Sequence, residues 1–186
     1  MAPHIMTGVA LITGAASGIG RACALTFADE GVTRLILADI NTSGLQETSD
    51  LLTKLNPEVQ ALVIKTDTSS ESDVQKMVDA AVKKFGSIQY AVNCAGVTSE
   101  PRAKSADLSV EAWDRVMNIN IRGVWLCQRA VIRQMLRQEY LPADQMRSGA
   151  APERGSIVNI SSVLGRSAHP TNGSVRVMLS TIIHLH

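Results

Sequence analysis

Three closely spaced glycines are the first residues of this sequence whose types and spacing indicate chemistry. Gly14, Gly18 and Gly20 stand in TGAASGIG, directly after the apolar run Val9–Ile12. This order predicts a strand, a glycine turn and a helix. The N-terminus of a helix offers unpaired N–H groups and a positive dipole end, which favour a phosphate group. The spacing therefore indicates a dinucleotide-binding turn, although a glycine turn that binds no ligand would give the same pattern.

Each glycine has its own predicted purpose in such a turn. The first permits the tight turn, the second lets the backbone approach a pyrophosphate, and the third lets the helix lie close on the sheet. Helical spacing places Ile19, Cys23 and Phe27 on one face of the following segment. We expect that face to be the apolar side of the helix.

Two aspartates follow two further apolar runs. Asp39 ends the run Leu35–Ala38, 19 residues after Gly20. A carboxylate there can accept hydrogen bonds from an adenosine ribose and would repel a 2′-phosphate, or it can cap the next helix. Asp67 follows the run Val59–Ile64. For this residue an adenine contact and a turn or cap role both stay open.

Strand and helix patterns alternate along the chain. Strands are expected at Val9–Ile12, Leu35–Ala38, Val59–Ile64, Ile88–Val92 and Ser156–Ile160. Helices are expected over a segment that includes Ile19 and Phe27, from Leu45 to Leu55, from Ser70 to a stop at Gly86, and from near Ser109 past Val131. Residues 139–155 are expected to form a loop or surface insertion. This alternation predicts an α/β fold with a parallel sheet, whose ligands bind beyond the carboxyl ends of the strands.

Composition narrows the class of protein. The chain has 186 residues, a net charge of +1 and only 3% aromatic residues, which argues against nucleic-acid and membrane partners. The opening MAPHIMT lacks a basic region, so a cytoplasmic location is expected. Cys23, Cys94 and Cys127 are far apart and are expected to be buried small hydrophobes. No metal site is predicted. The pair His184 and His186 is either an exposed chain end or a pair of ligands on a strand.

Taken together and in order, these motifs resemble the short-chain dehydrogenases/reductases, of the shorter type with a TGxxxGxG pattern. The resemblance runs from Gly8 to about Ser174 and also includes NCAG at 93–96, NINIRGV at 118–124 and IVNISS at 157–162. It implies a doubly wound, Rossmann-like sheet between two layers of helices, and NAD rather than NADP as cofactor. The cofactor-binding residues it implies are Gly14, Ser17, Gly18, Ile19, Gly20, Asp39, Asp67, Asn93, Ala95 and Gly96.

The resemblance also implies a reaction, the reversible transfer of a hydride between the nicotinamide and a small alcohol or ketone. Ser162 would hold the substrate oxygen, and Asn120 would help to position a water chain that carries the proton onward. In this family a tyrosine, assisted by a lysine in a Tyr-x-x-x-Lys pair, exchanges that proton. On the residues alone, Asn120 can equally be a buried amide that pairs with backbone groups, and Ser161 and Ser162 can be turn residues.

The sequence departs from the family pattern after Ser174. Val175 stands where the tyrosine is expected, 13 residues beyond Ser162, and the last lysine of the chain is Lys104. Tyr90 and Tyr140 are the only tyrosines. We therefore expect a family domain at residues 1–174 that is incomplete at its C-terminal end, an unrelated segment at 175–186, and little or no turnover.

Three interpretations of this departure stay open. The chain is an oxidoreductase that lacks its proton-transfer pair, a non-catalytic protein that binds NAD or a partner, or the product of a retained intron or a frameshift. The homo-oligomer expected for the parent protein would be weakened. The strand Ser156–Ile160 would form an exposed apolar edge of the sheet.

Overall fold

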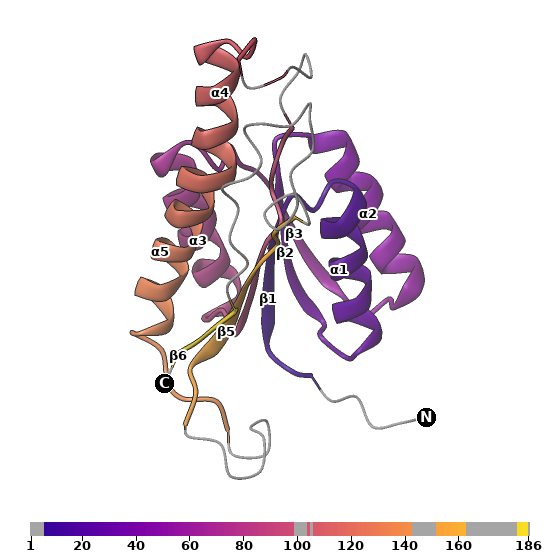
Figure 1. Cartoon of the computed structure of the whole chain (residues 1–186). Helices are drawn as coiled ribbons and strands as arrows, with labels where there is room; N and C mark the ends of the chain where they lie inside the picture. The colour runs from indigo at the N-terminus through magenta and orange to yellow at the C-terminus, as the bar shows by residue number, and fades with distance from the viewer. Residues whose placement is uncertain (1–5, 99–103, 105, 143–151, 163–181, 186) are drawn as a thin grey trace.

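Five parallel strands and one antiparallel strand form a single sheet in the order β3-β2-β1-β4-β5-β6 (Figure 1). The structure, a computed structural model, describes residues 6–98, 104, 106–142, 152–162 and 182–185. The strands are β1 Val9–Thr13, β2 Arg34–Asp39, β3 Gln60–Lys65, β4 Tyr90–Asn93, β5 Gly155–Asn159 and β6 Ile182–Leu185. The predicted doubly wound α/β class is confirmed.

Helices cover both faces of this sheet. Helices α1 (Gly18–Asp29) and α2 (Thr42–Leu55) lie on one face, and α3 (Glu71–Phe85), α4 (Val110–Met117) and α5 (Val124–Met135) lie on the other, as Figure 1 shows. The layers arise from strand alternation, since successive side chains of a strand point to opposite faces. In β1, Val9 and Leu11 join the core under α3 and α5, whereas Ala10 and Ile12 join the core under α1 and α2.

The buried face of α1 differs from the predicted one. Gly20, Ala24 and Ala28 are its buried residues, whereas Ile19 is 59% exposed and Cys23 and Phe27 are only partly buried. The cause is the close approach of α1 to the glycine turn. A Cβ at Gly20 would lie 2.1 Å from the carbonyl oxygen of Gly14, so only small residues fit along this side.

Local capping residues set the ends of α3 as predicted. The Ser70 hydroxyl accepts a hydrogen bond from the Asp73 N–H, and Gly86 ends the helix with φ +85°. The long helix after Ser109 also begins as predicted, because the Ser109 hydroxyl accepts from the Ala112 N–H. It is not one regular α-helix, however. A π-helical segment, η1 (Asn118–Gly123), joins α4 to α5.

The segment η1 lies against the loop that follows β3. A Cβ at Gly123 would lie 3.1 Å from the Thr68 carbonyl oxygen, and Arg122 Nη1 donates to the Ser69 carbonyl at 2.6 Å. A π-helical turn inserts one residue into the helix and rotates the next helical residues about the axis, and such turns are frequent at functional sites. The sequence pattern did not reveal this turn.

The prediction that Ser156–Ile160 leaves an exposed sheet edge is wrong. Strand β6 pairs antiparallel with β5, with Ile183 opposite Ile157 and His184 opposite Ser156. His184 is therefore part of the ladder and not of a free chain end, while His186 lies outside the described residues. Because an apolar strand leaves unsatisfied backbone groups at an edge, any segment that can extend beside it removes that cost.

Two hallmarks of other protein classes are absent from the described part of the chain. No helix there is long and apolar enough to cross a bilayer. Nor does any group of three or more His, Cys, Asp or Glu side chains gather there in a way that could hold a metal ion.

Candidate functional site

A cavity of about 840 Å³ opens where the carboxyl ends of the parallel strands meet. Its size suits a cofactor or substrate. It brings together residues that are far apart in the sequence, namely the glycine turn, the ends of β2 and β3, the loop after β4, η1 and the end of β5. Of the predicted site residues it is lined by Gly14, Ser17, Gly18, Ile19, Gly20, Asp39, Asp67, Ala95, Gly96, Asn120 and Ser162. Asn93 is buried and is not part of the lining.

The glycine turn forms one end of this cavity. Gly14 and Gly18 adopt φ +70° and +52°, and a Cβ on Gly18 would meet no atom within 4 Å, so open space lies in front of this residue. The N-cap residue of α1, Ser17, makes no side-chain capping hydrogen bond, in contrast to Ser70 and Ser109. The first N–H groups of α1 therefore have no cap of their own and can bind an anion.

Asp39 is held rigidly at the carboxyl end of β2. Its Oδ2 accepts from the Ala16 N–H at 3.2 Å and its Oδ1 accepts from the Asn41 N–H at 2.9 Å. The cap of α2 is Asn41 itself, whose side chain accepts from the Gly44 N–H. Each carboxylate oxygen keeps a free lone pair. Asp39 can thus accept further hydrogen bonds from a ligand without moving.

Asp67 makes the turn that was one of its two expected roles. Its Oδ1 accepts from the backbone N–H and the hydroxyl of Ser69, at 2.9 and 2.7 Å. The residue is exposed and lines the cavity, so the adenine contact stays a prediction.

The loop after β4 is fixed by hydrogen bonds from two neighbouring strands. The Thr13 hydroxyl accepts from the N–H groups of Cys94 and Ala95, at 3.1 and 3.2 Å. The buried Asn93 donates from Nδ2 to Asn159 Oδ1 at 2.7 Å, and Asn159 in turn donates to Gln128 on α5 at 2.8 Å. Asn93 therefore supports the loop from behind.

Asn120 lies inside η1, is only 4% exposed and clamps the same loop. Its Oδ1 accepts from the Val97 N–H and its Nδ2 donates to the Val97 carbonyl, both at 2.8 Å. This is the expected buried amide that pairs with backbone groups. It also brings η1 to the cavity wall, where Ser161 and Ser162 follow β5. Whether Asn120 and Ser162 act in catalysis stays a prediction.

The thiols differ from the expectation that all three are buried. Cys127 is buried, whereas Cys23 and Cys94 are partly exposed, and all three are free. Cys94 lines the cavity. Its pKa is raised to about 11, chiefly by burial and further by the nearby Cys23 and Asp39. The Cys94 side chain is therefore a neutral thiol at neutral pH.

Sequence reasoning missed two residues of the cavity wall on the long helix. Arg115 and Ile119 line the cavity together with Asn120. Helical spacing from Asn120 does not find them, because Ile119 directly precedes Asn120, Arg115 stands five positions earlier, and η1 departs from the α-helical period. Arg115 gives this wall a positive charge.

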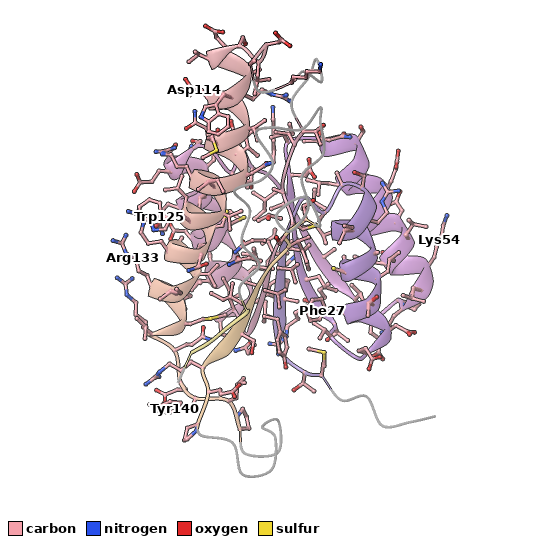
Figure 2. All side chains as sticks on the ribbon, in the orientation of Figure 1. Phe27, Lys54, Asp114, Trp125, Arg133 and Tyr140 are labelled. Carbon is pink, nitrogen blue, oxygen red and sulfur yellow. The ribbon has the colours of Figure 1, made fainter. Side chains whose placement is uncertain are left out.

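Neither tyrosine lines the cavity. Tyr90 begins β4, and its ring lies 5.6 Å from that of Phe27, while Tyr140 follows α5 beneath the Arg154 guanidinium at 3.9 Å. Figure 2 labels Phe27 and Tyr140 toward the amino ends of the strands, away from the site. Among the described residues, no phenol is placed to exchange a proton in this cavity.

Comparison with known proteins agrees with this geometry. The family model described as short chain dehydrogenase matches residues 8–174. The chain belongs to the short-chain dehydrogenase family. Family members are oxidoreductases, and the family resemblance drawn from the glycine turn and the NCAG, NINIRGV and IVNISS motifs is confirmed.

Individual family members show the extent of the likeness. The short-chain dehydrogenase fogB of Aspergillus ruber is 35% identical over 169 residues, which make up 89% of this chain and 61% of the relative. The structure of NAD⁺-bound xylitol dehydrogenase matches with 32% identity and a TM-score of 0.77, covering 90% of this chain and 57% of that one. A Burkholderia phymatum short-chain dehydrogenase/reductase in complex with NAD matches with 31% identity and a TM-score of 0.77. The match covers 92% of this chain and 55% of that one.

The chain thus spans about three fifths of the length of the curated relatives it matches. The matches to NAD-bound structures support a nicotinamide cofactor for this family fold.

Proposed function

We propose that this protein binds NAD at the cavity and that the site serves hydride transfer between NAD(H) and a small alcohol or ketone. The observation that carries the proposal is the joining of the glycine turn, Asp39 and Asn120 in one cavity at the carboxyl ends of the strands. The residues fit such a cofactor. Open space lies in front of Gly18, and the N–H groups at the start of α1 lack a capping side chain.

Each part of the chain has a defined task in this proposal. The first N–H groups of α1 bind the pyrophosphate, and Asp39 accepts hydrogen bonds from the adenosine ribose. The Ser162 hydroxyl holds the substrate oxygen, and Asn120 fixes the loop after β4 through the Val97 backbone. When bound, the nicotinamide supplies the acceptor or donor of the hydride.

We propose a preference for NAD over NADP. Asp39 is fixed by two backbone N–H groups, and a second negative charge from a 2′-phosphate would meet it at short range. Isothermal titration should give a lower Kd for NADH than for NADPH, and Asp39→Ala should reduce the difference between these two Kd values. Asp29→Ala, on the exposed end of α1, should leave it unchanged. Equal affinities in the native protein would contradict the role of Asp39.

We propose that residues 1–174 act as a cofactor-binding domain and that the 186-residue chain turns over little substrate. General acid–base catalysis contributes about 10²–10⁴-fold, and the described cavity wall offers no phenol. Joining residues 1–174 to a family segment with a Tyr-x-x-x-Lys pair should restore NAD-dependent activity, and Ser162→Ala should then abolish most of it. Robust activity of the native chain would contradict this.

The other interpretations give different outcomes in the same assays. A non-catalytic binding protein would bind NADH in a cooperative fold and show no turnover, and joining a Tyr-x-x-x-Lys segment to residues 1–174 would not restore activity. A product of a retained intron or frameshift would bind nothing and aggregate, and the gene would show a splice donor overlapping the Val175 codon or a shifted frame.

We also propose a cytoplasmic location and a homo-oligomer that is weaker in this chain than in the parent protein. The free thiols suit a reducing compartment. Val110, Trp125 and Leu136 expose large apolar side chains along the long helix. That helix carries acidic residues near its start and arginines near its end, so two copies packed antiparallel would pair opposite charges. Sedimentation velocity would measure the oligomeric state, and a monomer at all concentrations would contradict the proposal.

A further inference from the structure

The Arg21 guanidinium joins α1, α2 and the glycine turn behind the cofactor cavity. Its Nη2 donates to the carbonyls of Ala16 at 2.5 Å and Gly44 at 3.3 Å, and its Nε donates to the Thr48 hydroxyl at 3.0 Å. It also pairs with Glu47 at 2.8 Å. The side chain is 26% exposed, whereas that of Glu47 is 65% exposed. The ion pair therefore contributes little, and the bonds to the turn and to α2 are the stronger constraint.

Helix α2 is shaped to reach the turn. Thr48 is fully buried, and its hydroxyl lies 2.8 Å from the Ala15 carbonyl and 3.0 Å from the Gly44 carbonyl. A Cβ on Gly44 would lie 2.8 Å from the Ala16 carbonyl oxygen. The absence of a side chain at Gly44 is what lets α2 approach so closely. None of Arg21, Gly44 and Thr48 lines the cavity.

These bonds fix the direction of two peptide groups. In a trans peptide the carbonyl and the following N–H point in opposite directions. Thr48 holds the Ala15 carbonyl toward α2, and the following N–H, that of Ala16, reaches Asp39 on the other side. By the same geometry, Arg21 holds the Ala16 carbonyl toward α2 and thereby turns the N–H of Ser17 away from α2.

We propose that Arg21 and Thr48 are positioning residues that orient the glycine turn for the pyrophosphate, an inference that rests on the proposed binding of NAD. Arg21 also adds a positive charge behind the start of α1, which favours an anionic ligand. The effect on binding is therefore specific to the phosphates. An adenosine without phosphates depends chiefly on Asp39. That carboxylate loses at most the Ala16 bond when the turn shifts and keeps its bond from the Asn41 N–H, so adenosine binding should change less than phosphate binding.

The test measures the Kd of NADH and ADP by isothermal titration and that of adenosine by NMR titration, using the full chain. Arg21→Gln should raise the Kd of NADH and that of ADP about tenfold, which is the loss expected for charge-assisted hydrogen bonds. Adenosine should change less than about twofold. Arg21→Lys keeps the charge but reaches fewer acceptors, so its loss should be smaller. Thr48→Val should raise the Kd of ADP about threefold. Thr48→Ser keeps the hydroxyl and should leave that Kd unchanged.

Glu47→Gln is the matched control, because it removes the ion pair and leaves the bonds of Arg21 to the backbone. It should bind all three ligands as the native protein does. Equal weakening by Glu47→Gln and Arg21→Gln would overturn the proposal, as would an equal loss for adenosine and ADP, which indicates general misfolding. If Arg21→Gln does not fold, the comparison of Thr48→Val with Thr48→Ser tests the proposal in its place, since only the valine variant should bind ADP more weakly. Failure of the native chain to bind NADH would instead overturn the proposed function, and the positioning role with it.

Discussion

Gly18 and Gly20 lie two positions apart, yet a methyl group added to each meets different surroundings. At Gly20 it would lie 2.1 Å from a backbone carbonyl oxygen. At Gly18 it would meet nothing within 4 Å, but the backbone φ of +52° is unfavourable for any residue with a side chain. Gly20→Ala should lower the free energy of unfolding by about 3 kcal/mol or more. Gly18→Ala should cost about 1–2 kcal/mol and also weaken NADH binding. Urea denaturation measures both, and equal losses would contradict this account.

Cys94 gives the site a pH-dependent chemical label. Because its pKa is raised to about 11, the reactive thiolate fraction grows about tenfold per pH unit below that value. Alkylation of Cys94 by iodoacetamide should therefore be slow at neutral pH and about a hundredfold faster two pH units higher. Mass spectrometry assigns the labelled residue, and NADH should protect it.

The internal control for this labelling is Cys127, whose pKa burial raises to about 12 and which should stay unlabelled in the folded protein. Labelling of Cys94 at the rate of free cysteine near neutral pH would show that the thiol is not desolvated.

At the scale of elements, the amides of Asn93, Asn159 and Gln128 connect β4, β5 and α5. Asn159→Leu should lower the free energy of unfolding by about 1–3 kcal/mol, because it leaves the buried Asn93 amide without its partner. The double variant Asn93→Val and Asn159→Leu should recover part of the loss, since an apolar pair has no unmet hydrogen bonds. Thermal or urea unfolding provides the measurement.

Gln75→Ala is the control for the loss of the buried amide contacts. Gln75 donates to Asp79 on the exposed face of α3, so its loss should change stability by less than about 0.5 kcal/mol. A similarly small effect of Asn159→Leu would mean that the buried amides are not coupled.

The elements that the sequence predicts correctly are those that local chemistry determines. Ser70 and Gly86 bound α3 through contacts within one turn of the helix, so a pattern of neighbouring residues was enough. The turn of η1 depends on Gly123 fitting against Thr68, about fifty residues away in the sequence. The same holds for Arg21, whose partners Gly44 and Thr48 lie on another helix. Such contacts cannot be read from local periodicity.

For the candidate site, the topology of the sheet explains why so many of its residues were predictable. Strand ends that are far apart in the sequence meet at one edge of a parallel sheet, so Asp39 and the glycine turn had to be neighbours. Asn93 was expected in the site as well, but it does not line the cavity. In a strand, alternate side chains point to opposite faces, and Asn93 points toward α5 through Asn159 and Gln128.

At the scale of the whole molecule, β6 pairs with β5 and covers the edge that β5 would otherwise expose. The double variant Ile182→Pro and Ile183→Pro removes two backbone donors, so at least part of the β5 edge would become available to other chains. This double variant should form larger aggregates in light scattering than the native protein at equal concentration. Valines at the same positions keep the donors and should behave as the native protein does. An unchanged scattering profile for the proline variant would show that β6 does not protect the edge.

The two tryptophans of the chain both lie on the long helix, Trp113 in α4 and Trp125 in α5, on either side of η1. Tryptophan emits at wavelengths that reduced nicotinamide absorbs and oxidised nicotinamide does not. Excitation energy should therefore pass from this helix to bound NADH. We expect NADH to quench the tryptophan emission and to gain emission of its own, whereas NAD⁺ should do neither. Replacing Trp113 and Trp125 by phenylalanine one at a time would give the separate contribution of each end of the helix, and so report where along it the nicotinamide lies.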